Sequence, residues 1–230
     1  MPARRAIART AAPLRQQVVQ MIREDILQEN LKPGQRLVES VLCETYDVSR
    51  TVIREALRQL ESEHLITVVP NSGPIVTVLS QQDIQALYVV RANLEGLTAN
   101  LFAQNASDEQ CQQLLNIAAR LDKEYRHGDV QSRELIKAEF YDVLISGAHN
   151  NVLRETLGLI HARIAIFRRF AFLDESRTEE SIAELKTIIH EAAEAHNGQA
   201  AATAAEDHVI LAAKYAEQEY ISRNAALIEA

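Results

Sequence analysis

The sequence has 230 residues, of which 47% are hydrophobic and 24% charged, and it contains no tryptophan and few glycines or prolines. This composition is typical of a globular, largely helical chain and excludes a disordered or collagen-like one. Its two cysteines, Cys43 and Cys111, form no disulfide framework, and no apolar run approaches the length of a membrane span. We therefore expect a soluble cytoplasmic protein.

The net charge of −8 is distributed unevenly along the chain. Residues 1–78 carry a net charge of +1, whereas residues 79–230 carry −9. Five arginines and no acidic residue precede Glu24. The first third is therefore suited to lie against a polyanion, which would repel the remainder.

The first third reads as a flexible basic arm over residues 1–10, followed by helices. Pro13 suits a first helical turn, and apolar residues then repeat every fourth position until Asn30. The tetrapeptide "LKPG" predicts a tight turn, and a short helix follows over about 39–46. Ser49 is expected to cap the next helix by accepting its unpaired N–H groups.

That next helix carries a stripe of arginines. Arg50, Arg54 and Arg58 are spaced four residues apart and therefore share one face, while Ile53 and Leu57 lie on the opposite face. The stripe alone fits either a solvated basic face or a recognition helix that points at phosphates and base edges.

The segment "ITVVPNSGPIVTV" predicts a hairpin, because two β-branched runs flank a turn rich in proline and glycine. Helix, short helix, helix and hairpin within residues 11–78 indicate a winged helix-turn-helix DNA-binding domain. The arginine helix then takes the place of the recognition helix, and Gly73 in the wing lets the backbone approach a duplex closely.

Residues 79–230 predict helices only, so the fold class is mainly α. "SQQD" and "SDEQ" are capping boxes that open helices near 81–105 and 108–126, the second of which Gly128 closes. Further periodic segments cover about 130–148, 151–174, 177–196 and 199–225. Six such helices predict an antiparallel bundle, and bundle interiors commonly hold ligands.

The stretch "LKPGQRLVESVLCETYDVSRTVIREALRQLESEHLI" resembles the DNA-binding domain of the GntR family of bacterial transcription regulators. Turn, glutamate, helix start and arginine pair keep the family's spacing. Val52, Cys43 and His64 replace a common Pro, Ala and Gly, which we expect to alter packing only slightly, and Ser40 removes one basic phosphate contact. The resemblance implies these DNA-contacting residues: Arg36, Ser49, Arg50, Thr51, Arg54, Arg58 and Gly73.

The bundle, from "VVRANLEGLTANLFA" onward, is similar to the FCD ligand-binding and dimerisation domain of the FadR branch of that family. Many FCD domains hold a divalent metal with Asp-x-x-x-His and two later histidines. Here the first pair falls on Lys137 and Tyr141, and the next ligand on Leu185 or Lys186. Of the expected ligands only His208 remains, with His190 one turn too late to match, so the resemblance predicts no family-type metal, although His190 and His208 leave a metal site open.

The resemblance also implies an effector, and the substitutions suggest its charge. Lys137 and Lys186 would supply the positive charge of the missing metal to an anionic metabolite, with Tyr141 and His208 as hydrogen-bond donors. Arg91 falls where relatives place an effector-binding arginine. Two other interpretations stay open: Arg91 pairs with Glu95 at i,i+4, and the lysines are simply solvated. Three further arginines are expected at the surface or at a dimer interface rather than in the effector site: Arg163, Arg168 and Arg169.

The sequence thus predicts a ligand-responsive regulator, either repressor or activator, that binds a palindromic operator as a homodimer. The alternatives are an effector-blind DNA-binding protein and an enzyme with a helical catalytic domain. The enzyme is disfavoured because no HExxH, P-loop, nucleophile-elbow or paired-carboxylate motif is present. The histidines at helix ends, His127, His149 and His196, are explained by C-capping.

Overall fold

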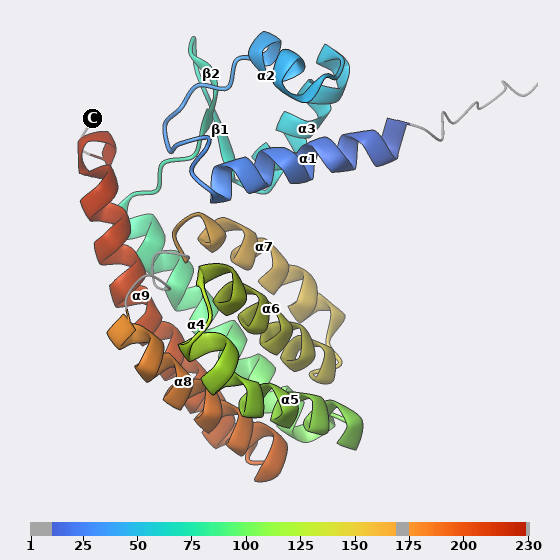
Figure 1. Ribbon diagram of the computed structural model, residues 1–230, viewed down its shortest axis with the longest axis vertical. Helices are drawn as coiled ribbons and strands as arrows, with labels where there is room; N and C mark the ends of the chain where they lie inside the picture. The colour runs from blue at the N-terminus through green and yellow to red at the C-terminus, as the bar shows by residue number, and fades with distance from the viewer. Residues whose placement is uncertain (1–10, 169–174, 229–230) are drawn as a thin grey trace, which may run out of the picture. The chain divides into compact units, whose positions relative to one another are not determined.

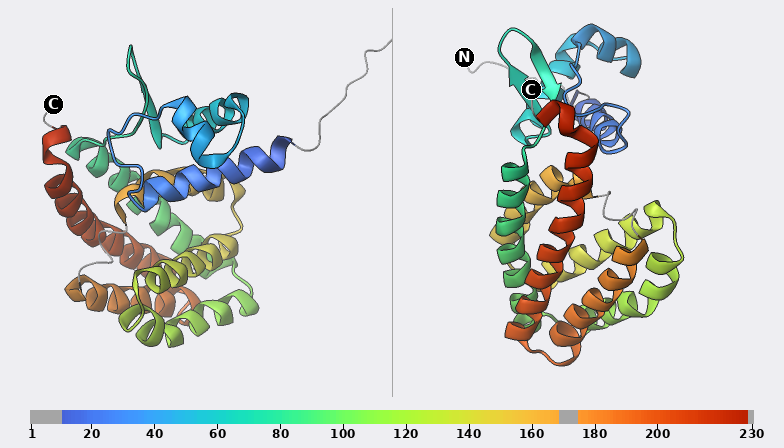
Figure 2. Two further views of the ribbon diagram at one scale, coloured as in Figure 1. Left: turned by 45° about the horizontal axis from the view of Figure 1, so that its top comes forward. Right: turned by 90° about the vertical axis from the view of Figure 1, so that its left-hand side faces the viewer.

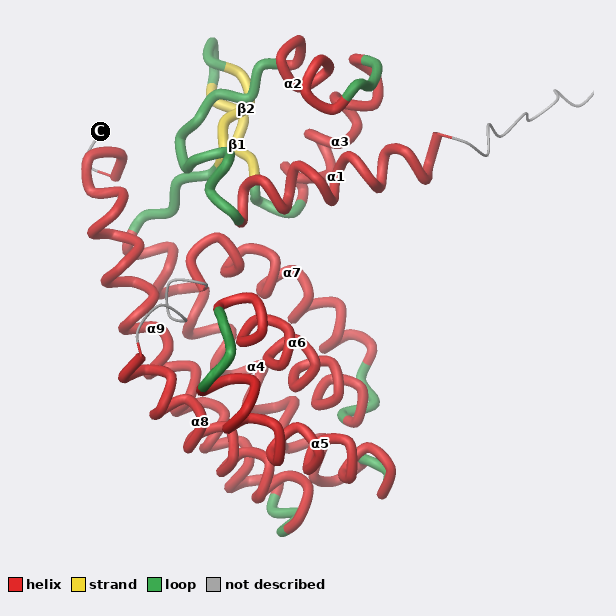
Figure 3. Tube along the Cα trace, in the orientation of Figure 1, coloured by secondary structure: helices red, strands yellow, loops and turns green. Residues whose placement is uncertain are grey.

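A computed structural model describes residues 11–168 and 175–228, and the basic arm expected at residues 1–10 lies outside them. The chain forms two compact units, Met1–Val78 and Leu79–Ala230. Helices dominate both units, and the strands found among the described residues form one small hairpin (Figure 3). The mainly α fold class is confirmed. No described helix is long and apolar enough to cross a membrane.

In the described part of the first unit, three helices are followed by a hairpin (Figure 1). Its elements are α1 (Ala11–Leu27), α2 (Glu39–Tyr46), α3 (Arg50–Ser62), β1 (Ile66–Val69) and β2 (Gly73–Val76). The strands are antiparallel, with Ile66 opposite Val76 and Val69 opposite Gly73. Helix, short helix, helix and hairpin form a winged helix-turn-helix, which confirms the arrangement that the sequence pattern predicts.

Helix α3 packs against α1 because one of its faces is apolar. Ile53 and Leu60 are fully buried, as is Ile22 of α1. Ser49 caps α3, since its hydroxyl accepts a hydrogen bond from the Val52 N–H at 3.5 Å. The cap and the buried face fix the helix with its opposite face in solvent.

His64 ends the segment after α3 in a left-handed conformation, with φ of 60°. A side chain in this region of backbone space is strained, and glycine is the residue that adopts it freely. The expectation was that His64 would alter packing only slightly; the structure adds that the substitution also strains the backbone. His149 and His196 have similar φ values of 51° and 50° shortly after the helical segments that end at Gly147 and Glu194, which confirms that they end helical segments.

The second unit is a bundle in which α4 and α9 run side by side (Figure 2). Its elements are α4 (Gln81–Asn105), α5 (Asp108–Arg120), η1 (Leu121–Arg126), α6 (Val130–Gly147), α7 (Asn151–Arg168), α8 (Glu175–Ile189), η3 (His190–Glu194) and α9 (Gly198–Ile228). Both capping boxes are present, Ser80 with Asp83 and Ser107 with Gln110. They confirm the predicted starts of α4 and α5.

Two predicted helices are not regular to their ends. The segments expected at 108–126 and 177–196 finish as the π-helical turns η1 and η3, and in η3 the Ala195 N–H bonds the His190 carbonyl five residues back. Gly128 follows η1 where an added Cβ would lie 2.1 Å from the Glu124 carbonyl oxygen. The helix expected at 151–174 is described to Arg168, and residues 169–174 lie outside the description.

Candidate functional site

The exposed face of α3 presents the arginine stripe to solvent. Arg50, Thr51, Arg54 and Arg58 are all exposed, and Arg54 keeps 59% of its side-chain surface accessible. Ser49, also exposed, stands at the start of the helix with its hydroxyl used as the cap. The structure therefore brings these residues to the exposed surface of a helix that is packed on its other side, with Ser49, Arg50, Thr51 and Arg54 near its N-terminal end.

The predicted wing residues lie beside the hairpin. Arg36 is exposed, and its backbone forms an isolated bridge with Ile75 of β2. Gly73 has φ of 81°, and nothing lies within 4 Å of the position where its Cβ would be. The glycine is therefore required by backbone conformation rather than by crowding.

The interior of the second unit contains a group of charged side chains, which we call the buried polar cluster: Arg91, Glu95, Lys137, Tyr141, His161, Arg177, Glu184 and His208. Arg91 on α4 donates through Nε to Glu95 Oε1 at 2.6 Å and through Nη2 to the Tyr141 hydroxyl at 2.8 Å. His161 Nε2 lies 2.9 Å from the same Glu95 oxygen. Arg91 is 1% exposed, and its Nη1 is buried without a hydrogen-bond partner among the described residues.

The other half of the cluster centres on His208 of α9. Lys137 Nζ lies 2.8 Å from His208 Nε2, and His208 Nδ1 contacts Glu184 of α8. Arg177 donates to both oxygens of Glu184, at 2.8 and 2.6 Å. Helix α6 joins the halves, because Lys137 and Tyr141 stand one turn apart on it.

His208 is neutral and carries its proton on Nδ1. Burial, together with the charges of Lys137 and Arg177, lowers the pKa of His208 well below 6.5. A carboxylate only accepts hydrogen bonds and an ammonium only donates them. The contacts with Glu184 and Lys137 are therefore both satisfied when Nδ1 donates and Nε2 accepts.

The cluster brings cationic and anionic side chains together. Burial raises the pKa of Glu95, but Arg91 and His161 outweigh it and hold that pKa well below its usual range. Among the described members of the cluster, three cationic side chains, those of Arg91, Lys137 and Arg177, stand against the carboxylates of Glu95 and Glu184. Arg177 also lies 3.8 Å from the exposed carboxylate of Glu180. An anion placed among the cationic side chains of the cluster would be stabilised by them.

Four of the predicted effector residues are members of the cluster, namely Arg91, Lys137, Tyr141 and His208. Lys186 is not, because its side chain is 42% exposed and its Nζ bonds Asp122 at 2.6 Å on the surface. Lys186 therefore lies apart from the other four predicted effector residues.

The sequence reasoning missed part of the cluster. Arg177 and Glu184 are seven residues apart, and this spacing, which puts both on one face of α8, was the available signal. His161 carried no comparable signal, since it reaches Glu95 from another helix.

The residues around His208 do not fit a divalent metal. His190 is 59% exposed and bonds Glu194 at 2.7 Å, whereas His208 is 1% exposed. No group of three or more His, Cys, Asp or Glu suited to a metal occurs in the described part of the chain. The ammonium of Lys137 already faces His208 Nε2, where a metal would have to stand about 2.0–2.1 Å from the nitrogen. The two cations would repel each other.

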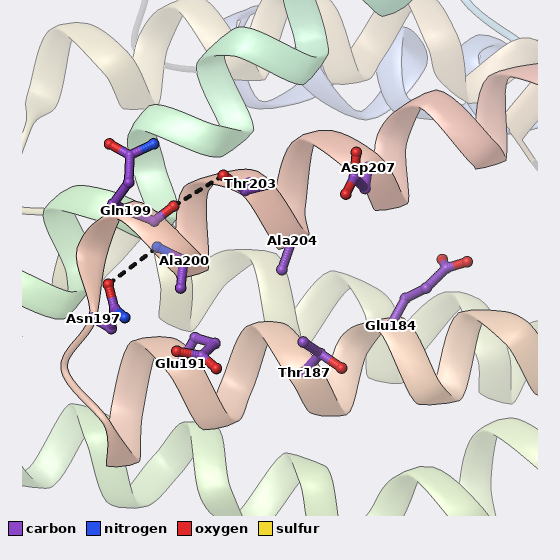
Figure 4. A pocket seen from close by; sticks show the side chains of 9 residues that line it. All are labelled: Glu184, Thr187, Glu191, Asn197, Gln199, Ala200, Thr203, Ala204 and Asp207. Atoms are coloured by element: carbon purple, nitrogen blue, oxygen red, sulfur yellow. Dashed lines mark hydrogen bonds between the residues drawn. The ribbon is translucent and has the colours of Figure 1, made fainter.

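A groove of about 580 Å³ lies between α8 and α9 (Figure 4). Thr187 and Glu191 face Ala200 and Ala204 across it, and its lining includes Glu184 of the buried polar cluster. Glu191 and Asp207 add two further carboxylates. Because its lining is acidic, the groove is unfavourable for anions.

Comparison with known families matches both units. Residues 14–76 match the family described as bacterial regulatory proteins, gntR family, and residues 86–211 match the FCD domain. The second match alone covers more than half of the chain.

Curated relatives and solved structures agree with these matches. The chain is 28% identical over 177 residues to the HTH-type transcriptional regulator YdhC of Bacillus subtilis, which covers 76% of this chain and 79% of that protein. It is 32% identical over 141 residues to the Nta operon transcriptional regulator of Aminobacter aminovorans, covering 60% and 66% respectively. The structure of McbR/YncC from E. coli matches with a TM-score of 0.75 at 19% identity, over 90% of this chain and 98% of that one.

Proposed function

Because the chain belongs to the GntR family of bacterial transcription regulators and carries an FCD domain, we propose that it binds a palindromic operator as a homodimer and that a small anionic metabolite in the buried polar cluster changes its operator affinity. It is a DNA-binding regulator rather than an enzyme, as its relatives are. Its place of action is the cytoplasm, where bacterial DNA lies.

Operator binding is assigned to α3 and the wing. Arg50, Thr51 and Arg54 are exposed near the N-terminus of α3, the part of a recognition helix that reaches base edges. One winged helix covers few base pairs, and two related by a dyad read a palindrome with better discrimination. A homodimer follows from this requirement.

The observation that carries the effector proposal is the buried guanidinium of Arg91. Its Nη1 donates to no described residue, although a buried donor without a partner costs about 1–3 kcal/mol. Because Arg91 is a cation, its unpartnered donor favours a ligand that accepts hydrogen bonds and bears a negative charge. A small carboxylate satisfies both requirements.

In this proposal Lys137 replaces the metal of related FCD domains. The metal's role there would be to neutralise an anionic effector, and the Lys137 ammonium supplies a positive charge beside His208, the one matching ligand position. The protein is therefore expected to work without zinc, nickel or manganese.

The proposal is tested by a thermal-shift screen on extensively dialysed protein with acetate, lactate, citrate and inorganic phosphate. An anion at 100 times its dissociation constant raises stability by about 2.7 kcal/mol, which is readily detected. Lys137→Ala should abolish the shift, whereas Lys186→Ala, which removes a surface lysine paired with Asp122, should retain it. Elemental analysis of the same sample should find no stoichiometric metal.

Three results would contradict the proposal. Elemental analysis that finds one metal per chain would mean that the protein binds a metal ion despite the loss of the family's ligands. A shift that persists in Lys137→Ala would place the anion elsewhere. A protein stabilised by none of the anions but still bound to DNA would support an effector-blind regulator.

A further inference from the structure

An ion pair joins the recognition helix to the helix before it. Arg54 Nε lies 2.8 and 2.9 Å from the two carboxylate oxygens of Glu39, the first residue of α2. The side chains are 59% and 32% exposed, so the pair stands at the surface that α3 presents. Both residues belong to elements of the first unit, α2 and α3 (Figure 1).

The geometry of this pair leaves the end of the guanidinium available. Glu39 engages Nε, and neither Nη group of Arg54 donates to a side chain or carbonyl in the described residues. An arginine reads guanine by two parallel hydrogen bonds to O6 and N7, which the two Nη groups can form end-on. Glu39 thus fixes the direction of the Arg54 guanidinium without occupying its two Nη groups.

The charge of Glu39 has a second consequence. The hydrogen bond from Arg54 holds the pKa of the Glu39 carboxyl below its usual range, so the side chain remains an anion. Phosphate contacts supply the sequence-independent part of DNA affinity, and an anion beside Arg54 disfavours such a contact. A base edge, which carries partial charges only, is penalised less.

We infer that Glu39 is a positioning residue that directs Arg54 toward a base edge and disfavours its use as a phosphate clamp. The selectivity of the protein for its operator then depends on an acidic side chain that need not touch DNA. The inference rests on the proposed role of α3 in operator binding.

The test compares a duplex selected by the wild-type protein from a random pool with a random-sequence duplex of equal length. Affinities are measured by fluorescence anisotropy at several salt concentrations for Glu39→Ala and Glu39→Gln. Glu44→Gln is the matched control, since it removes the same charge from an exposed position of the same helix.

Glu39→Ala should bind the random duplex more tightly and the selected duplex more weakly, so that the ratio of the two affinities falls about tenfold or more. Glu39→Gln keeps an oxygen that accepts from Arg54 Nε. It should retain affinity for the selected duplex while binding the random duplex more tightly and with a steeper salt dependence. Glu44→Gln should change both affinities by the same small factor.

An affinity ratio in both Glu39 variants equal to that of Glu44→Gln would overturn the inference. Equal tightening on both duplexes in Glu39→Ala would also overturn it, because Glu39 would then only repel DNA. Circular dichroism checks that each variant is folded. If Glu39→Ala is unfolded, the test rests on Glu39→Gln, and an affinity of this variant for the random duplex no tighter than that of Glu44→Gln overturns the inference. A wild-type protein that selects no duplex would instead contradict the proposed operator binding.

Discussion

Replacing Glu95 by glutamine should destabilise the protein more than any comparable surface change. Glu95 and Arg91 are 3% and 1% exposed, and Glu95 accepts hydrogen bonds from both Arg91 and His161. In Glu95→Gln the Arg91 guanidinium stays buried without its anion, and its Nη1 already lacks a partner. Breaking a buried pair from one side costs about 3–5 kcal/mol.

Urea unfolding followed by far-UV circular dichroism measures this loss, since the chain has no tryptophan for fluorescence. The matched control is Glu219→Gln, which breaks an i,i+4 pair with Arg223 at 2.8 Å whose side chains are 42% and 43% exposed. An exposed helical pair of this kind contributes about 0.3–0.5 kcal/mol. A loss in Glu95→Gln no larger than in the control would refute the claim that the cluster holds desolvated charges.

The stability difference between wild type and Glu95→Gln should also depend on pH in a defined direction. The pKa of Glu95 lies below its value of 4.5 in an unfolded chain because Arg91 and His161 outweigh the effect of burial. Its contribution to stability is therefore complete above pH 4.5 and is lost as pH falls from there through the lowered folded pKa. The gap between wild type and Glu95→Gln should be constant from pH 7 to about 5 and narrow in stronger acid. A stability difference that disappears near neutral pH would contradict the lowered pKa of Glu95 in the folded protein.

Four further predictions concern other parts of the chain. His64→Gly should raise the thermal stability by about 0.5–1 kcal/mol, because φ of 60° is strained for histidine, and a loss would contradict this. Gly128→Ala should cost about 1–3 kcal/mol in the same melting experiment, since its Cβ would meet a carbonyl oxygen at 2.1 Å, and unchanged stability would refute the contact. Arg50→Ala and Arg54→Ala should each weaken operator binding by about 1–3 kcal/mol in gel shifts at fixed salt, and unchanged affinity in both would remove α3 as the reader. Light scattering should show a dimer at micromolar concentration, and a monomer that stays monomeric with DNA would contradict it.

Features set by local interactions could be predicted from the sequence. Ser80 with Asp83 and Ser107 with Gln110 form capping boxes within four residues, so their hydrogen bonds need no knowledge of the fold. The hairpin follows similarly from a turn and two β-branched runs. The π-helical turns were missed because hydrophobic periodicity does not record a hydrogen bond to the fifth residue back.

The cluster was predicted only in part because helix register decides which side chain points inward. Lys186 and Glu184 are two residues apart on α8, and a step of two turns the side chain to nearly the opposite side of the helix. Glu184 therefore contacts His208 while Lys186 reaches Asp122 on the surface. A motif alignment uncertain by one position could not make this distinction.

Burial was the other quantity that spacing could not supply. Arg91 and Glu95 are four residues apart, a separation that suits a solvated surface pair equally well. The structure buries both because α4 packs against α9 and α6. His161 reaches Glu95 from 66 residues away, a contact that exists only in the folded bundle.

The most direct test of the effector proposal is the affinity for the wild-type-selected duplex, measured by fluorescence anisotropy with and without the anion that gives the largest thermal shift among acetate, lactate, citrate and phosphate. The account predicts that this anion changes the DNA affinity of the wild-type protein and of Lys186→Ala. It predicts no change for Lys137→Ala, which should bind DNA like the wild type when the anion is absent. An anion effect of equal size in Lys137→Ala, or none in the wild type, would contradict the account.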